Sequence, residues 1–183
     1  MTSLTARLTV EPLDVARDAL VLHAWVTHPK AVFWEMADAS VADVVSAYEE
    51  IAADPHHEAF LGRADGTPAF LVERYDPAHG VLAAHGPWGP GDVGMHVLVA
   101  PADDPVPGFT RAVFRTVMEL LFEDPAVERV VVEPDIRNDR IAVLNAEAGF
   151  VVHGPVQLPT KVAALSSCTR DQYLASPLGR STA

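Results

Sequence analysis

Residues 91–109 read GDVGMHVLVAPADDPVPGF, and this stretch decides the fold. It contains an apolar run, residues 93–99, that predicts a strand carrying a single histidine, His96. A proline-rich loop follows, and the stretch 108–124 then has the apolar spacing of an amphipathic helix. A strand, a loop and a helix in this order bind phosphate in many folds, because the first N–H groups of the helix have no acceptor within it.

The loop and the helix start give mixed signals for a phosphate. Gly108 lies where the loop meets the helix, and Arg111 lies in the first helical turn. Backbone N–H groups and an arginine at this place would favour an anion. Asp103 and Asp104 in the loop would repel it, and an arginine on a surface helix is also commonplace without any ligand.

Flanking segments predict the rest of the fold. Before the stretch already described, we expect a strand over 5–11, a helix from the N-cap Asp14 to before Pro29, and a helix from Ser40 to Asp54. A hairpin over 57–76, turning at Asp65-Gly66, and a loop over 77–91 then follow. After that stretch and its helix, we expect a strand over 127–134, a helix from the N-cap Asn138 to Gly149, one or two strands over 151–167, and a loose tail from about 176 to 183. This order predicts a mixed α/β sheet in one domain that covers residues 1–183.

Composition limits the classes of protein that the chain can belong to. The 183 residues are 49% hydrophobic and carry a formal net charge of −12, which argues against a nucleic-acid partner and is compatible with a cationic small substrate. The single cysteine, Cys168, excludes an internal disulfide framework. No apolar run is long enough to span a bilayer, and the first residues lack the pattern of a secretory signal, so we expect a cytoplasmic protein with no membrane partner.

His96 and Asp135 are the two residues whose positions suggest chemistry. A histidine on an apolar strand is either a buried, satisfied core residue or a proton acceptor near neutral pH. Asp135 follows the strand over 127–134, where ligands bind in open α/β sheets. The alternative is that Asp135 and Asn138 only cap the next helix.

A third segment, THPKAVFW at residues 27–34, places His28 and Trp34 near the end of a predicted helix. Its spacing does not specify a metal site, and no metal is expected. The sequence also lacks the motifs of a serine nucleophile elbow and of a P-loop.

Taken together, the motifs HPKAVFW, GDVGMH, EPD.RN, AGF and LPTK resemble the GNAT superfamily of acyl-CoA-dependent N-acyltransferases over nearly the whole chain. Within it, the chain is similar to the siderophore-biosynthesis branch that acylates hydroxylamino groups, and most similar to the acyltransferases of desferrioxamine biosynthesis, which act on N-hydroxycadaverine. The resemblance implies a single-domain α/β fold with a mixed, mostly antiparallel central sheet flanked by helices. It also implies acetyl-CoA or succinyl-CoA as co-substrate, a small hydroxylated diamine as acceptor, and a hydroxamate for iron acquisition as product.

The resemblance also assigns roles to particular residues. It implies that His96 and Asp135 lie near the attacking nitrogen as catalytic groups. It places the acceptor near His28, Trp34 and Asn138. Glu133, a carboxylate next to Asp135 in the sequence motif, is a further expected binding residue, because a carboxylate would recognise a cationic amine. The co-substrate is expected to meet the strand backbone and the loop before the long helix, at Val97, Val99, Gly108, Phe109, Thr110 and Arg111.

Other functions remain open at this point. The acceptor is expected to be N-hydroxycadaverine or a relative such as hydroxylysine or hydroxyornithine, and a plain amine or an aminoglycoside-like acceptor is the alternative within enzymes. The acidic loop departs from the basic, glycine-rich loop of the superfamily, which favours a non-catalytic binding domain as the competing class.

Overall fold

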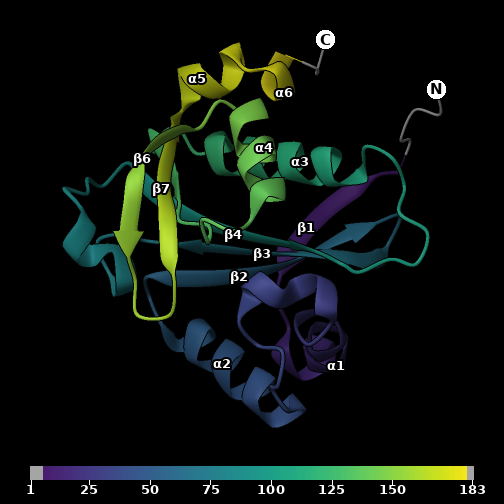
Figure 1. Ribbon diagram of the computed structural model, residues 1–183. Coiled ribbons are helices and arrows are strands. Elements are labelled where there is room, and N and C mark those ends of the chain that lie inside the picture. The colour runs from purple at the N-terminus through teal and green to yellow at the C-terminus, as the bar shows by residue number, and fades with distance from the viewer. Residues whose placement is uncertain (1–5, 181–183) are drawn as a thin grey trace. The chain divides into compact units, whose positions relative to one another are not determined.

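The structure, a computed structural model, describes residues 6–180 (Figure 1). Seven strands form a sheet in the order β1-β2-β3-β4-β5-β7-β6. The β4–β5 pair is parallel, whereas β1–β2, β5–β7 and β6–β7 are antiparallel, which confirms the predicted mixed sheet. The strands are β1 Leu8–Pro12, β2 His57–Ala64, β3 Thr67–Tyr75, β4 Asp92–Val99, β5 Arg129–Val132, β6 Val151–Gln157 and β7 Val162–Thr169.

The described helices are α1 Val15–Val26, α2 Val41–Ala53, α3 Phe109–Glu123, α4 Asp139–Glu147, α5 Arg170–Ala175 and α6 Pro177–Arg180, together with the 3-10 helices η1 Pro29–Trp34 and η2 Gly80–His85. The four predicted helices, α1 to α4, occur in the predicted order, and four further helical elements that were not predicted, α5, α6, η1 and η2, are added to them. None of the described helices has both the length and the apolar character needed to cross a membrane.

Three of the predicted boundaries need correction. The loop expected over 77–91 contains η2, whose Leu82 is fully buried. The tail expected to be loose from about 176 forms α6 over residues 177–180, because Leu178 and Gly179 are buried there; residues 181–183 lie outside the described part. The first strand, expected from residue 5, begins at Leu8; residue 5 itself lies outside the part of the chain that the structure describes.

The chain divides into two compact units, and β4 and α3 each contribute to both. The first unit consists of residues 1–74 and 96–113, and the second of residues 75–95 and 114–183. That one domain covers the whole of residues 1–183 stays a prediction.

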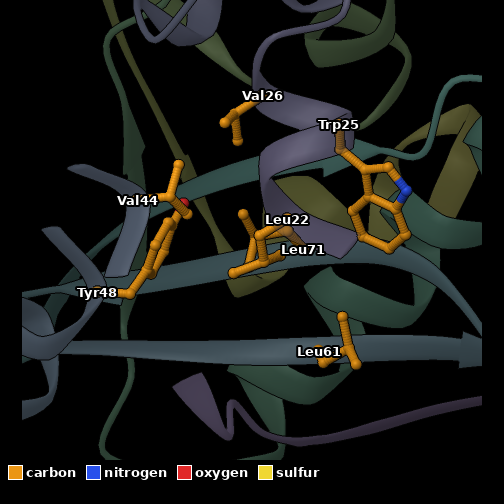
Figure 2. Packing of buried hydrophobic residues seen from close by; sticks show 7 residues of the cluster. All are labelled: Leu22, Trp25, Val26, Val44, Tyr48, Leu61 and Leu71. Atoms are coloured by element: carbon orange, nitrogen blue, oxygen red, sulfur yellow. The ribbon is translucent and has the colours of Figure 1, made fainter. Parts of the chain in front are cut away.

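The core of the first unit lies between α1, α2, β2 and β3. Its buried side chains belong to one cluster: Leu22, Trp25, Val26, Val44, Tyr48, Leu61 and Leu71 (Figure 2). The helices start where the sequence predicts, because Asp14 accepts the N–H of Arg17 and Ser40 forms a capping box with Asp43. These caps fix the start of each helix, so that α2 can direct Tyr48 into the cluster.

The β2–β3 hairpin turns at Asp65 and Gly66, as predicted. Both residues have positive φ, 49° and 83°, which a two-residue hairpin turn requires. The tight turn sets the alternation of both strands, and it thereby places Glu73 on β3 with its side chain buried.

The second unit contains the β6–β7 hairpin, followed by α5 and α6 (Figure 1). Its buried apolar cluster consists of Tyr75, Leu82, Val131, Leu158, Ala163 and Leu165. The Tyr75 ring lies directly over Gly94, where a Cβ atom would be 2.1 Å from the ring. A glycine at position 94 is therefore required for this packing.

Replacing Gly94 by alanine should lower the free energy of unfolding by about 1–3 kcal/mol, because the new methyl group overlaps the buried Tyr75 ring. Chemical denaturation of both proteins measures the difference. Gly89→Ala is the matched control, since a Cβ atom there would come no closer than 3.9 Å to another group, the carboxylate of Asp92. Equal losses in the two variants would contradict the packing described here.

Candidate active site

His96 lies on β4 with its side chain about one third exposed. Its Nδ1 atom is 2.9 Å from the Oε2 atom of Glu73 on β3. The Trp34 ring meets the imidazole edge-on, with 6.2 Å between the ring centroids. His96 is therefore neither a fully buried core residue nor a free surface residue, because one side of the ring is held and part of it is accessible.

Glu73 is buried and stands at the centre of a polar cluster. The hydroxyl of Tyr48 donates to its Oε1 atom over 3.0 Å, and the Nε2 atom of His57 lies 3.5 Å from its Oε2 atom. Trp34 in turn donates from its indole nitrogen to the Tyr48 hydroxyl over 3.3 Å. Burial alone would raise the pKa of Glu73, but the hydrogen bond with His96 and the close approach of the two imidazole rings, His57 and His96, lower that pKa to about 2. The carboxylate is therefore ionised at neutral pH.

Tyr48 remains a donor in this cluster. Burial and the negative charge of Glu73 raise the pKa of the Tyr48 hydroxyl well above its usual range. The hydroxyl thus keeps its proton and donates it in the hydrogen bond to Glu73 at all ordinary pH values.

The segment that carries His28 and Trp34 forms η1. His28 is its N-cap, and the Nδ1 atom of His28 accepts the N–H of Lys30 over 3.1 Å. Trp34, at the other end of η1, contacts His96. Of these two predicted acceptor-binding residues, Trp34 is thus joined to the His96 cluster, whereas one ring nitrogen of His28 is used to begin η1.

The loop before α3 is exposed, and Asp103 and Asp104 lie on its surface. Gly108 has a φ of 82° at the end of the loop, and its carbonyl oxygen accepts the N–H of Ala112 in the first turn of α3. The N–H of Phe109 is already donated to the carbonyl oxygen of Val106 over 3.1 Å. Of the backbone donors predicted here, that of Phe109 is therefore occupied.

Two further groups offer donors to an anion near this loop. The N–H of Thr110 belongs to the first helical turn, where it has no acceptor within the helix. The Lys30 ammonium group donates to the carbonyl oxygen of Ala102 over 2.7 Å, which brings a positive charge to an otherwise acidic loop. Arg111 is exposed in the same first turn of α3, and together with the Thr110 N–H and Lys30 it is of the chemical kind that binds phosphate.

The backbone of β4 offers donors at Val97 and Val99. Ala100 donates its N–H to Ala69 of β3. Backbone N–H groups alternate between the two edges of a strand, so those of Val97 and Val99 point to the edge away from β3. β4 pairs with β5 over Asp92–Gly94, which precede Val97 and Val99 along the strand.

Asp135 belongs to the second unit, and its carboxylate is fully engaged. Its two oxygens accept hydrogen bonds from Arg137, from the backbone N–H at 2.8 Å and from the guanidinium group at 2.9 and 2.6 Å. These hydrogen bonds lower the pKa of Asp135 to about 2. Asp135 is therefore ionised and a weak proton acceptor.

The other predicted residues of the second unit are also accounted for. Glu133 is buried, accepts a hydrogen bond from the Tyr75 hydroxyl and lies 3.9 Å from the Lys161 ammonium group. The side chain of Asn138 accepts the N–H of Ile141 over 3.3 Å as the N-cap of α4. For Asn138, the capping alternative is thus observed directly.

Glu73, Tyr48 and His57 are the residues of the cluster that the sequence analysis missed. The signal was present in AFLVERY, residues 69–75, where one carboxylate interrupts an apolar strand. A buried carboxylate is costly without partners, so its presence there indicates hydrogen-bond donors nearby.

Comparison with known proteins gives this geometry its context. The model of the acetyltransferase (GNAT) domain matches residues 14–158. The chain belongs to the GNAT acetyltransferase family. It is accordingly an acyl-CoA-dependent N-acyltransferase, and its sheet and helices are those of the GNAT fold. An enzyme is therefore favoured over the non-catalytic binding domain that the acidic loop had suggested.

Individual relatives of this GNAT protein act on different acceptors. The N-hydroxyputrescine acetyltransferase of Acinetobacter baumannii is 27% identical over 94% of this chain and 80% of its own length. The N(6)-hydroxylysine O-acetyltransferase of Escherichia coli is 25% identical over 87% of this chain and 51% of its own length, so the chain spans about half of that protein. The crystal structure of the aminoglycoside acetyltransferase AAC(6')-Ib with coenzyme A has a TM-score of 0.80 at 25% identity, covering 91% of this chain and 97% of its own.

Proposed function

We propose that this acyltransferase transfers an acetyl or succinyl group from acyl-CoA to the hydroxylated nitrogen of an N-hydroxydiamine similar to N-hydroxycadaverine. The product is a hydroxamate, whose two oxygens suit ferric iron, and the reaction belongs to siderophore biosynthesis. The acyl carbon forms a bond to nitrogen, the carbon–sulfur bond breaks, and the proton lost from nitrogen balances the thiol of coenzyme A.

The relatives support a hydroxylated acceptor. One is named for N-hydroxyputrescine, a diamine one methylene shorter than the proposed acceptor, and another for hydroxylysine. The net charge of −12 supports a cationic acceptor, since an acidic surface raises the local concentration of cations.

The placement of His96 carries the proposal. A hydroxylamine nitrogen is weakly basic and enters the reaction largely unprotonated, so the enzyme needs to remove one proton as the new bond forms. His96 is accessible on one side and held by Glu73 on the other, which suits a general base. We assign this step to His96 alone.

Asp135 receives a different role. The resemblance implies a catalytic group at Asp135, but its low pKa and its hydrogen bonds to Arg137 leave it a weak proton acceptor, so we assign it no proton transfer. We assign it to holding the turn before α4 through its hydrogen bonds to Arg137. Glu133, which is buried with Tyr75 and Lys161, is assigned to supporting that turn from within.

The donors on β4 and α3 are assigned to the co-substrate. In the proposal, the N–H groups of Val97 and Val99 bind the pantetheine arm and polarise the thioester carbonyl. The pyrophosphate meets Thr110 and Arg111, with Lys30 compensating for the acidic residues of the loop. Gly108 and Phe109 shape this helix start, and His28 fixes η1 so that Trp34 lines the acceptor side.

Initial rates of coenzyme A release with matched acceptors test the proposal. With acetyl-CoA or succinyl-CoA, we expect kcat/KM for N-hydroxycadaverine to exceed that for cadaverine by at least about tenfold, because the plain amine is almost fully protonated at neutral pH and must first lose a proton. Equal values for both amines would make the protein a general diamine acyltransferase. Turnover of an aminoglycoside alone would move the assignment to the acceptor class of AAC(6')-Ib.

A further inference from the structure

The polar cluster around Glu73 contains more than a general base requires. Three titratable side chains from three elements face this carboxylate: His57 from β2, Tyr48 from α2 and His96 from β4. The nearer histidine has a direct hydrogen bond to the Oε2 atom, and the second histidine lies 3.5 Å from the same atom. One buried anion is thus shared between two imidazole rings.

We propose that Glu73 is a positioning residue that fixes the tautomer of His96, and that His57 tunes His96 by competing for the same carboxylate oxygen. The inference rests on the proposed role of His96 as proton acceptor. It assigns Glu73 and His57 roles in the reaction that they exert through His96, without contacting the substrates themselves.

The tautomer follows from the chemistry of the contact. An ionised carboxylate can only accept hydrogen bonds, so the Nδ1 atom of His96, 2.9 Å away, must carry the hydrogen. Nε2 of the neutral ring is then the lone-pair nitrogen, on the side of the ring away from Glu73. The other carboxylate oxygen, Oε1, accepts the hydrogen bond from Tyr48, so the Glu73 carboxylate cannot rotate away from His96 without losing that hydrogen bond.

Charge explains the role of His57. When His96 accepts a proton, the negative charge of Glu73 stabilises the imidazolium ion. A hydrogen bond or a positive charge from His57 on the same oxygen weakens that stabilisation. Removing Glu73 should therefore make His96 harder to protonate, whereas removing His57 should make it easier to protonate.

The two variants Glu73→Gln and His57→Phe test this, because they should move the acid limb of the pH–rate profile in opposite directions. We expect the acid limb of the pH–rate profile to move to lower pH by about 1 unit or more in Glu73→Gln, since a charge within hydrogen-bond distance is lost. In His57→Phe the limb should move to higher pH by about 0.5 unit. In Glu73→Gln we also expect kcat to fall by about 10- to 100-fold with little change in KM, because the amide no longer dictates one tautomer.

Nitrogen-15 NMR of the histidine rings gives a readout that needs no turnover. In the resting wild-type protein, at a pH where the ring of His96 is neutral, Nδ1 should carry the hydrogen and Nε2 should be unprotonated, with the signals assigned by their loss in His96→Gln. The pH at which the ring takes up its second proton should shift in the two variants as the acid limb does. If no amine is acylated but these shifts occur, the proposed function fails and the positioning role stands.

Ser40→Ala is the control for stability. It removes the capping box of α2, the helix that carries Tyr48, and should cost about 1 kcal/mol of unfolding free energy without moving the His96 titration. The inference is overturned if Glu73→Gln and His57→Phe, both folded, leave the His96 titration where it is in the wild type. Shifts of the same sign in both variants would also overturn it, as would a neutral wild-type ring that carries its hydrogen on Nε2.

Discussion

Replacing His96 by glutamine lowers kcat by about 10²–10⁴-fold, because the reaction loses its proton acceptor while the substrates can still be positioned. Glutamine retains an amide that can donate to Glu73, so the buried carboxylate keeps a partner and the fold should persist. Steady-state kinetics with saturating acyl-CoA and the N-hydroxydiamine measures the change. The melting temperature checks that the variant is folded.

His79→Gln provides the matched control for this loss. His79 also contacts a carboxylate, Asp76, at 3.0 Å, but its side chain is half exposed and it has no role in the proposed reaction. The variant should keep wild-type kcat. A folded His96→Gln protein that retains full activity would show that His96 is not the proton acceptor.

Replacing Leu22 by alanine has the largest expected effect on stability. Leu22 is fully buried on α1 and packs among the side chains of α2, β2 and β3, so its truncation leaves a cavity that the neighbours cannot fill (Figure 2). Leucine-to-alanine changes at such positions cost about 2–5 kcal/mol of unfolding free energy. In a chain of this length that corresponds to a melting temperature lower by about 4–20 °C.

Leu20→Ala on the same helix is the control, because the Leu20 side chain is 71% exposed. Its unfolding free energy should stay within about 0.5 kcal/mol of the wild type. Differential scanning calorimetry or urea denaturation measures both variants. Similar losses at positions 20 and 22 would contradict the orientation of α1.

The local signals in the sequence were sufficient for most of the secondary structure. Asp14, Ser40 and Asn138 act through hydrogen bonds to residues three positions ahead, so a short window of sequence contains both partners. The turn at Asp65-Gly66 is equally local. By contrast, α6 was missed because its formation depends on the burial of Leu178, and burial comes from contacts with distant parts of the chain.

The candidate site could be predicted only in part for the same reason. His96 was found by its residue type on an apolar strand, and Trp34 by its motif. Glu73 was not found, because its partners His57 and His96 lie 16 and 23 positions away and are brought to it only by the pairing of strands. The hydrogen bonds between Asp135 and Arg137 likewise depend on where the guanidinium group of Arg137 points, which the order of residues does not reveal.

Identification of the product tests the central claim most directly. The purified protein is incubated with acetyl-CoA and N-hydroxycadaverine, and in parallel with succinyl-CoA, and the product is examined by tandem mass spectrometry and by its ferric complex. The account predicts an acyl group on the hydroxylated nitrogen, hence a hydroxamate that binds iron, with one coenzyme A released per product. An acyl group on the distal amine or on the hydroxyl oxygen, or no product from folded protein, would contradict it.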